Sequence, residues 1–462
     1  MEPIAIMASL PGVREAEGAG GTDKPPSSLS SSKLTRELTL TDLVLMGLGN
    51  VVGAGVFVIL GKSILFGGKY TIPAFLVVAV ASILMGFVYL EVYSRHKSDI
   101  TEFLAIRDTM GDGVGKIALY VIYMFAVLSA VTIVVSMTKY VSRSQYFAHI
   151  FDHNNGNGSS STSSLKTRAF ELAFGGGLIA LMSAINYAGI HVSKIVANSV
   201  AVIMLLVLGG VAVMGSTRAC MADLTRMPDL PWDSVVLSGI LSLFLFNGYD
   251  FIVKVSDESV DPEDNKRALI YTLLITSAIY LCIIVSGICI LKYGTASTTY
   301  NLISKIYETV AGKNAGLLVY GAGLVIMFNT AFLSLLSASR FIYSCGKENN
   351  ISNPDFWSKL SEYHTPTNAI LATFAIAAAF SLVNNEVSIT MFTNFSALFI
   401  LMLLCLALIA TRWAERADAA KQSEHNYIIG NIDNIPIPVI IALLLILYAK
   451  YKIIQRTFFA RS

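Results

Sequence analysis

Charged residues are scarce in this sequence. Only 14% of its 462 residues are Asp, Glu, Lys or Arg, while 54% are hydrophobic. Soluble domains carry about 25% charged residues, so the shortage excludes an ordinary water-soluble fold and favours a chain that crosses a lipid bilayer. The formal net charge is only +2, which gives no basic surface for nucleic acid and excludes that class of partner.

Cysteine motifs and catalytic motifs are also absent. The five cysteines form no CxxC or Cys/His pattern, so we expect isolated small apolar side chains and no disulfide framework. The sequence has no P-loop, no dinucleotide fingerprint, no metal-spaced histidine pair and no nucleophile beside a base. It therefore predicts that the protein is not an enzyme and has no cofactor and no resident metal.

Long apolar runs dominate what is present. About eleven of them approach the ~20 residues that a bilayer requires. They are residues 41–66, 71–93, 115–141, 168–188, 192–215, 233–255, 268–291, 315–344, 367–383, 388–411 and 435–454. We therefore predict an all-α, multi-pass membrane protein.

The two ends of the chain differ from this apolar core. Residues 1–40 are rich in Gly, Ser and Pro and contain no cleavable signal, which predicts a disordered cytosolic tail. Residues 412–462 would form a cytosolic loop, an accessory helix and a C-terminal tail. If the N-terminus is cytosolic, the loops on the cytosolic side carry a small excess of basic residues, as the positive-inside rule requires. We therefore expect a cytosolic N-terminus, and we expect the protein to lie in the plasma membrane. Asn157 begins a sequon in a polar loop, which is either glycosylated or simply flexible.

Two of the apolar runs are interrupted by glycine. The first contains GNVVGAG around Asn50, and the sixth contains Asn247-Gly248 followed by Asp250. A glycine inside a helix costs ~0.5–1 kcal/mol relative to alanine. Glycine pairs alone often mark close helix packing, but the matching break five runs later favours a binding site. It predicts two inverted repeats of five helices, residues 41–215 and 233–411, with the first helix of each broken.

A broken membrane helix exposes backbone groups that hydrocarbon cannot satisfy, so they must face a ligand. The free N–H groups at a helix N-terminus suit a carboxylate, and the free carbonyls at a C-terminus suit an ammonium group. An amino acid carries both groups on one carbon. Two broken helices can therefore bind it through backbone atoms alone.

Three informative stretches follow one another along the chain: DLVLMGLGNVVGAGVFVILG, FLFNGYDFIVKVSDESVDPEDNKRALI and SASRFIYSCGKENNISNPDFWSKLSEYHTPTNAI. They resemble the first helix, the sixth helix with its following loop, and the eighth helix with its exit in the amino acid–polyamine–organocation transporters. Within that superfamily the sequence is similar to the cationic amino acid transporter-like branch, from about residue 38 to residue 411.

The resemblance implies a leucine-transporter-type fold and secondary active transport of amino acids by alternating access. It implies that N–H groups of three residues bind the substrate carboxylate, namely Gly53, Ala54 and Gly55. It also implies that carbonyls near Asn50 and Val51, and those from Phe244 to Phe246, bind the ammonium group. Phe244 stands at the position of an aromatic gate. The substrate would be an amino acid, with a cationic side chain or without one, or a polyamine.

Several roles stay open at the level of sequence. Asp250 binds a cationic substrate group, takes up a proton or pairs with Lys254. Tyr123 either lines the cavity or packs between helices. The fifth run lacks the lysine that replaces sodium in some relatives, so Na⁺ and H⁺ both remain candidates for coupling. Ser337 and Ser339 would bind Na⁺, unless they bond their own backbone.

Other functions and assemblies are also compatible with the sequence. A channel or an ion-only cotransporter would use the same scaffold. The protein would act in the lipid bilayer as a monomer or a homodimer.

Overall fold

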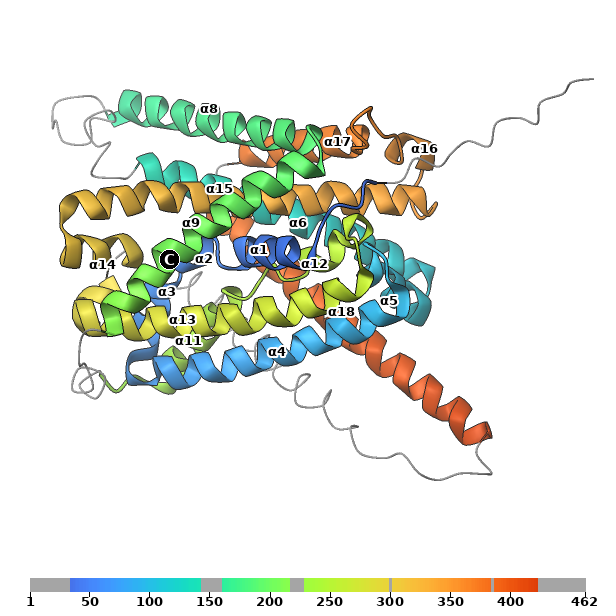
Figure 1. The fold of residues 1–462 in the computed structure, drawn as a ribbon, viewed down its shortest axis with the longest axis horizontal. Coiled ribbons are helices and arrows are strands. Elements are labelled where there is room, and N and C mark those ends of the chain that lie inside the picture. The colour runs from blue at the N-terminus through green and yellow to red at the C-terminus, as the bar shows by residue number, and fades with distance from the viewer. Residues whose placement is uncertain (1–33, 143–159, 217–227, 299–300, 384–385, 423–462) are drawn as a thin grey trace, which may run out of the picture. The chain divides into compact units, whose positions relative to one another are not determined.

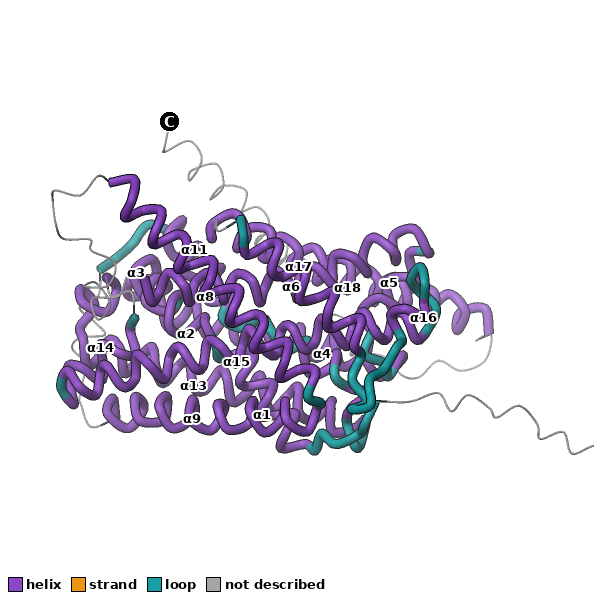
Figure 2. The backbone as a smooth tube through the Cα atoms, turned by 90° about the horizontal axis from the view of Figure 1, so that it is seen from above, coloured by secondary structure: helices purple, strands orange, loops and turns teal. Residues whose placement is uncertain are grey.

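The computed structural model describes residues 34–142, 160–216, 228–298, 301–383 and 386–422. These residues form helices joined by loops, and no strand occurs among them (Figure 2). The sequon at Asn157 and the apolar run 435–454 lie outside these ranges.

Eight helical stretches are long and apolar enough to cross a membrane, counted over the described residues. The long helices are α4 (Thr71–His96), α6 (Asp112–Ser142), α8 (Ser160–Tyr187), α9 (Ile190–Ser216), α13 (Pro262–Thr298), α15 (Lys313–Lys347) and α18 (Glu386–Gln422). Two shorter apolar helices are α11 (Trp232–Phe244) and α17 (Thr367–Ser381). The chain is thus an all-helical, multi-pass membrane protein, and each run predicted up to residue 411 corresponds to helix.

Three short helices were not predicted from hydropathy. They are α5 (Thr101–Met110), α14 (Leu302–Ala311) and α16 (Pro354–Trp357). A window of about 19 residues cannot detect helices of this length. Of the three, α5 matters most for the site, because it carries the buried residue Glu102.

The first and sixth apolar runs are interrupted at the predicted positions. Helix α1 (Leu40–Val51) is followed by α2 (Ala54–Val58) and α3 (Leu60–Gly67). Helix α11 ends at Phe244, and α12 (Phe251–Lys254) begins after a series of turns. We call residues 52–53 the first break and residues 245–250 the second break.

The first break lies inside the helix assembly. Helix α1 contacts α9, α13 and α15, and Figure 1 shows it between the long helices α13 and α15. It also contacts α12, the short helix after the second break. Asn50, Val51 and Val52 are all buried. The helices around α1 therefore bring both breaks into the interior.

Residues 37 and 38, within the predicted N-terminal tail, are hydrogen-bonded to the loop after α12. The backbone N–H groups of Glu37 and Leu38 both donate to the Glu258 carbonyl at 3.0 Å, and Val260 donates to the Leu38 carbonyl. Leu38 is fully buried. The segment that leads into α1 is therefore fixed to the loop that follows α12.

One expectation about cysteine is wrong. Cys282, Cys345 and Cys405 are free, but Cys289 in α13 is disulfide-bonded. Its partner is not among the described residues. Sequence spacing could not reveal the bond, because a disulfide between distant residues depends on how the helices pack.

Candidate functional site

A side chain of the first broken helix bonds directly to the second break. The Asn50 amide Nδ2 donates to the Gly248 carbonyl at 2.8 Å. Gly248 has a φ of +112°, a value that side chains rarely adopt, and a Cβ added there would lie 2.9 Å from Asn50 Nδ2. Glycine is therefore required at this point of contact. The two glycine-containing segments, almost 200 residues apart in the chain, form one junction.

Tyr280 on α13 joins the same two segments from another side. Its hydroxyl lies 3.0 Å from the Val51 carbonyl and 3.0 Å from the Leu245 carbonyl, and the residue is fully buried. These carbonyls lie at the C-terminal ends of α1 and α11. Because each helix stops there, no N–H group of a following turn can donate to them. One hydroxyl proton is shared between two acceptors. Tyr280 therefore holds the two helix ends at a fixed separation.

The sequence gives little sign of Tyr280. It lies in an apolar run in which a tyrosine usually contributes packing area, and its partner carbonyls come from distant segments. Its role depends on the packing of α13 against both breaks.

Helix α15 contacts the first broken helix through hydroxyl groups. Thr330 Oγ1 donates to the Gly49 carbonyl at 2.9 Å, and Ser334 Oγ bonds to Asn50 Oδ1 at 3.4 Å. A Cβ added to Gly53 would lie only 1.5 Å from Thr330 Oγ1. Close packing and an interrupted helix, the two interpretations of the glycine pattern, therefore both apply to this segment.

The start of α2 faces the second break. Gly53 is the N-cap residue of α2 and makes no side-chain cap hydrogen bond. The N–H groups of the first turn therefore have neither a capping side chain nor an intrahelical acceptor. A Cβ added to Gly55 would lie 3.0 Å from a methyl carbon of Leu245. The N–H donors at the start of α2 thus lie close to the end of α11, where the Leu245 carbonyl bonds to Tyr280.

Phe246 belongs to an aromatic cluster beside this junction. Its ring lies 5.7 Å from the ring of Phe75 and 5.8 Å from that of Tyr280, measured between centroids. Phe246 is only 1% exposed. Phe244 ends α11, and nothing is described of its ring.

A small cavity opens on the second break. Its lining includes Tyr89, Glu102, Phe125, Asn247, Gly248 and Asp250. Two carboxylates therefore border the segment that Asn50 contacts.

Of the roles open for Asp250, the ion pair is the one present in the structure. Asp250 Oδ2 contacts the Lys254 ammonium one helical turn later. Glu102 Oε2 lies 3.6 Å from the same nitrogen. Lys254 is 1% exposed and also lies 5.6 Å from the ring centroid of Phe125. A buried lysine thus stands between two acids, and hydropathy gave no reason to include Glu102.

The remaining candidates have partners elsewhere. The Tyr123 hydroxyl bonds to Thr373 on α17 at 3.0 Å. Ser337 and Ser339 donate to the carbonyls three residues before them, at 2.9 and 2.8 Å. Both serines therefore satisfy their own helix, which is the alternative to sodium binding.

Asn329 on α15 is a further polar residue beside the first broken helix. It is 1% exposed, and neither amide atom has a hydrogen-bond partner. A Cβ on Gly49 would lie 2.5 Å from its Nδ2. The neighbourhood of Gly49 therefore has unused hydrogen-bonding capacity. No cluster of His, Cys, Asp and Glu suited to a metal ion occurs in the described ranges.

Comparison with known proteins decides the family. A family model described as amino acid permease matches residues 38–456. The chain belongs to the amino acid permease family. This match confirms the resemblance to the amino acid–polyamine–organocation superfamily, and because the family consists of transporters it confirms that the chain is not an enzyme.

Individual relatives of this permease are distant. An uncharacterised transporter of Mycobacterium bovis is 26% identical over 75% of this chain and 74% of its own length. Cationic amino acid transporter 5 of Arabidopsis thaliana is 24% identical over 85% of this chain and 68% of its own. A methylthioribose transporter of Bacillus subtilis is 23% identical over 84% and 85%. These names differ in cargo, so the substrate must be argued from the site.

Proposed function

We propose that this permease is a secondary active transporter that moves amino acids across a membrane by alternating access. It would use a leucine-transporter-type fold of two inverted repeats, residues 41–215 and 233–411. The observation that carries the proposal is the pair of hydrogen bonds from Tyr280, which bring the open ends of α1 and α11 together. Interrupted helix ends gathered at one buried point are costly inside a membrane, and a bound polar ligand would stabilise them.

The substrate would bind as a zwitterion. N–H groups of Gly53, Ala54 and Gly55 at the start of α2 would hold its carboxylate. Carbonyls at the ends of α1 and α11, near Asn50 and Phe244, would hold its ammonium group. This use of backbone alone specifies the α-carbon groups and leaves the side chain to the surrounding pocket.

The disulfide supports the cytosolic N-terminus expected from the sequence. With the N-terminus in the cytosol, the seventh span runs outward, and Cys289 near its end lies outside. Disulfides persist in oxidising compartments and on cell surfaces. A bonded Cys289 therefore agrees with a cytosolic N-terminus and with the plasma membrane.

Counterflow in proteoliposomes tests this function. Unlabelled L-arginine or L-leucine inside the vesicles should drive saturable uptake of the labelled amino acid. Gly55→Leu should abolish it, because the added side chain would meet Leu245 at the second break. Gly177→Leu is the matched control, since a Cβ at that position on α8 meets nothing within 4 Å.

The same preparation separates the alternatives. Counterflow of spermidine without counterflow of any amino acid would replace the proposal with polyamine transport. Ionic conductance that does not saturate with amino acid would overturn transport altogether and indicate a channel.

A further inference from the structure

Three charged side chains lie together beside the second break, and two of them are buried. The exposed fractions of Lys254, Glu102 and Asp250 are 1%, 3% and 14%. Lys254 contacts both carboxylates, with 3.6 Å between its nitrogen and Glu102 Oε2. If all three groups are ionised, two negative charges face one positive charge. The cluster then has an excess of one negative charge.

The other titratable groups around this cluster are neutral at physiological pH. They are Tyr89 from α4, Tyr249 beside Asp250, and Cys405 on α18, whereas α6 contributes the ring of Phe125. Lys254 is the cation that contacts the two acids within the described ranges. The surroundings therefore do not compensate the excess charge.

An uncompensated charge away from water is costly, and the cost falls when the group takes up a proton. Glu102 Oε2 is buried and accepts no hydrogen bond. Burial raises the pKa of the Glu102 carboxyl, against the opposing effect of Lys254. Of the two acids, Glu102 is the more enclosed and so the better proton acceptor.

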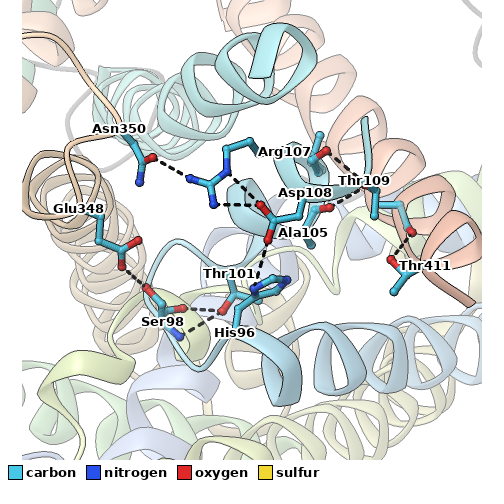
Figure 3. A network of polar contacts seen from close by, with 12 residues as sticks. His96, Ser98, Thr101, Ala105, Arg107, Asp108, Thr109, Glu348, Asn350 and Thr411 are labelled. Atoms are coloured by element: carbon cyan, nitrogen blue, oxygen red, sulfur yellow. Dashed lines mark hydrogen bonds and ion pairs between the residues drawn. The ribbon is translucent and has the colours of Figure 1, made fainter. Parts of the chain in front are cut away.

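The cluster is connected to both a fixed helix and the second break. Glu102 stands on α5, whose far end is held by Arg107 bonding to Asn350 and by the contacts around Asp108 (Figure 3). Asp250 and Lys254 lie on the segment that contains Gly248, the partner of Asn50. A shift of the second break would therefore change the distance from Glu102 to its cation.

We propose that Glu102, Asp250 and Lys254 form the coupling site of the transporter and bind one proton at the Glu102 carboxylate. The inference rests on the proposed function. A hydronium ion from the solution on one side protonates Glu102 and leaves as water, and the carboxylic acid returns the proton to water on the other side. Protonation leaves one carboxylate for one ammonium, so the cluster is neutral when the second break moves with its substrate. The coupling ion is thus a proton.

The test compares driven accumulation with counterflow. Proteoliposomes with the membrane potential clamped at zero receive labelled L-arginine or L-leucine under an inward proton gradient. Coupling to one proton gives about tenfold accumulation for one unit of pH difference, because each 1.4 kcal/mol is a factor of ten. Glu102→Gln imitates the protonated acid permanently, so it should keep counterflow and lose accumulation. Glu102→Asp keeps a carboxylate and should accumulate with a shifted pH midpoint.

Glu263→Gln is the matched control. Glu263 also contacts two lysines, Lys97 and Lys266, but about half of its side chain is in water. Its replacement should leave both accumulation and counterflow at the wild-type level.

Several results overturn the coupling site while leaving amino acid transport intact. One is wild-type accumulation in Glu102→Gln, and another is accumulation driven by a sodium gradient but not by a proton gradient. If Glu102→Gln fails to fold by size-exclusion chromatography, an unshifted pH midpoint in Glu102→Asp contradicts the site. Loss of counterflow in the wild type would instead overturn the proposed function and the inference with it.

Discussion

The two breaks use different chemistry. The first is short and tightly packed, and its polar neighbours are neutral: Thr330 bonds to Gly49, and Asn50 reaches the second break. The second extends over residues 245–250, borders a cavity and includes Asp250, which is paired with Lys254. Packing space thus specifies the first break, whereas the second combines a required glycine, Gly248, with charged side chains.

The different chemistry of the two breaks would let one junction perform two tasks, substrate binding and proton uptake. Neutral backbone groups can hold a zwitterion without any titratable side chain, so substrate binding need not depend on pH through the first break. A buried set of unequal charges can take up a proton without touching the substrate. Asn50 and Tyr280 join the first break to the second, so movement of one break would depend on movement of the other.

The largest expected effect comes from overfilling the first break. Gly53→Val should abolish folding or transport, because even a Cβ would lie 1.5 Å from Thr330 Oγ1. Because no Cβ can approach another atom this closely, the cost should exceed the ~1–3 kcal/mol typical of an overpacked core. The melting temperature of the purified protein and counterflow measure the effect. The double variant Gly53→Ala, Thr330→Ala should be more stable than the sum of the two single changes predicts, because Thr330→Ala removes the clash. If the losses in stability of the two single variants simply add, the contact between Gly53 and Thr330 is contradicted.

Removing the cation from the second break should have the next largest effect. Lys254→Met leaves two buried carboxylates without a counter-charge, a loss of ~3–5 kcal/mol at neutral pH. Protonation removes those charges, so stability should be recovered as pH falls and lost as pH rises. Thermal melts between pH 5 and pH 8 check the sign. A pH-independent loss would show that the lysine contributes packing alone.

Tyr280→Phe should have a smaller effect that involves both breaks. It leaves the carbonyls of Val51 and Leu245 without their shared donor, at ~1–3 kcal/mol. The KM for the amino acid should rise more than the maximal rate falls, because the helix ends lose their alignment. Tyr320→Phe is the control, since the Tyr320 hydroxyl also donates to a buried carbonyl, that of Tyr140. Equal changes in KM in both variants would show that Tyr280 has only a structural role.

The smallest expected effect is that of Ser334→Ala. Its bond to Asn50 Oδ1 is long, at 3.4 Å, and its hydroxyl also bonds to its own helix. We expect a loss of ~0.5–1 kcal/mol and KM within twofold of the wild type. A tenfold rise in KM would show that Asn50 depends on α15 for its orientation.

Local patterns in the sequence were enough to locate the breaks. Glycine within an apolar run indicates a weak helix wherever it occurs, so Gly53 and Gly248 could be found without a structure. Tyr280 and Glu102 could not, because each acts through contacts between segments that are distant in the chain. Glu102 also stands on α5, a helix too short for a hydropathy window.

The pairing of Asp250 shows the same limit in another form. Spacing along a helix allowed an ion pair with Lys254, but it could not show that Glu102 would approach the same ammonium group. The count of charges in the cluster, and hence the proposed proton, depends on that third residue.

Binding of matched analogues tests the central claim, that both breaks together hold one zwitterion. The melting temperature of the wild-type permease is measured with L-arginine, with agmatine, which lacks the carboxylate, and with δ-guanidinovaleric acid, which lacks the α-ammonium group. L-leucine, isoamylamine and isocaproic acid form the parallel series. The account predicts stabilisation by an intact amino acid and at least tenfold weaker binding of both of its truncated analogues. Equal stabilisation by an amine and its parent amino acid would contradict it.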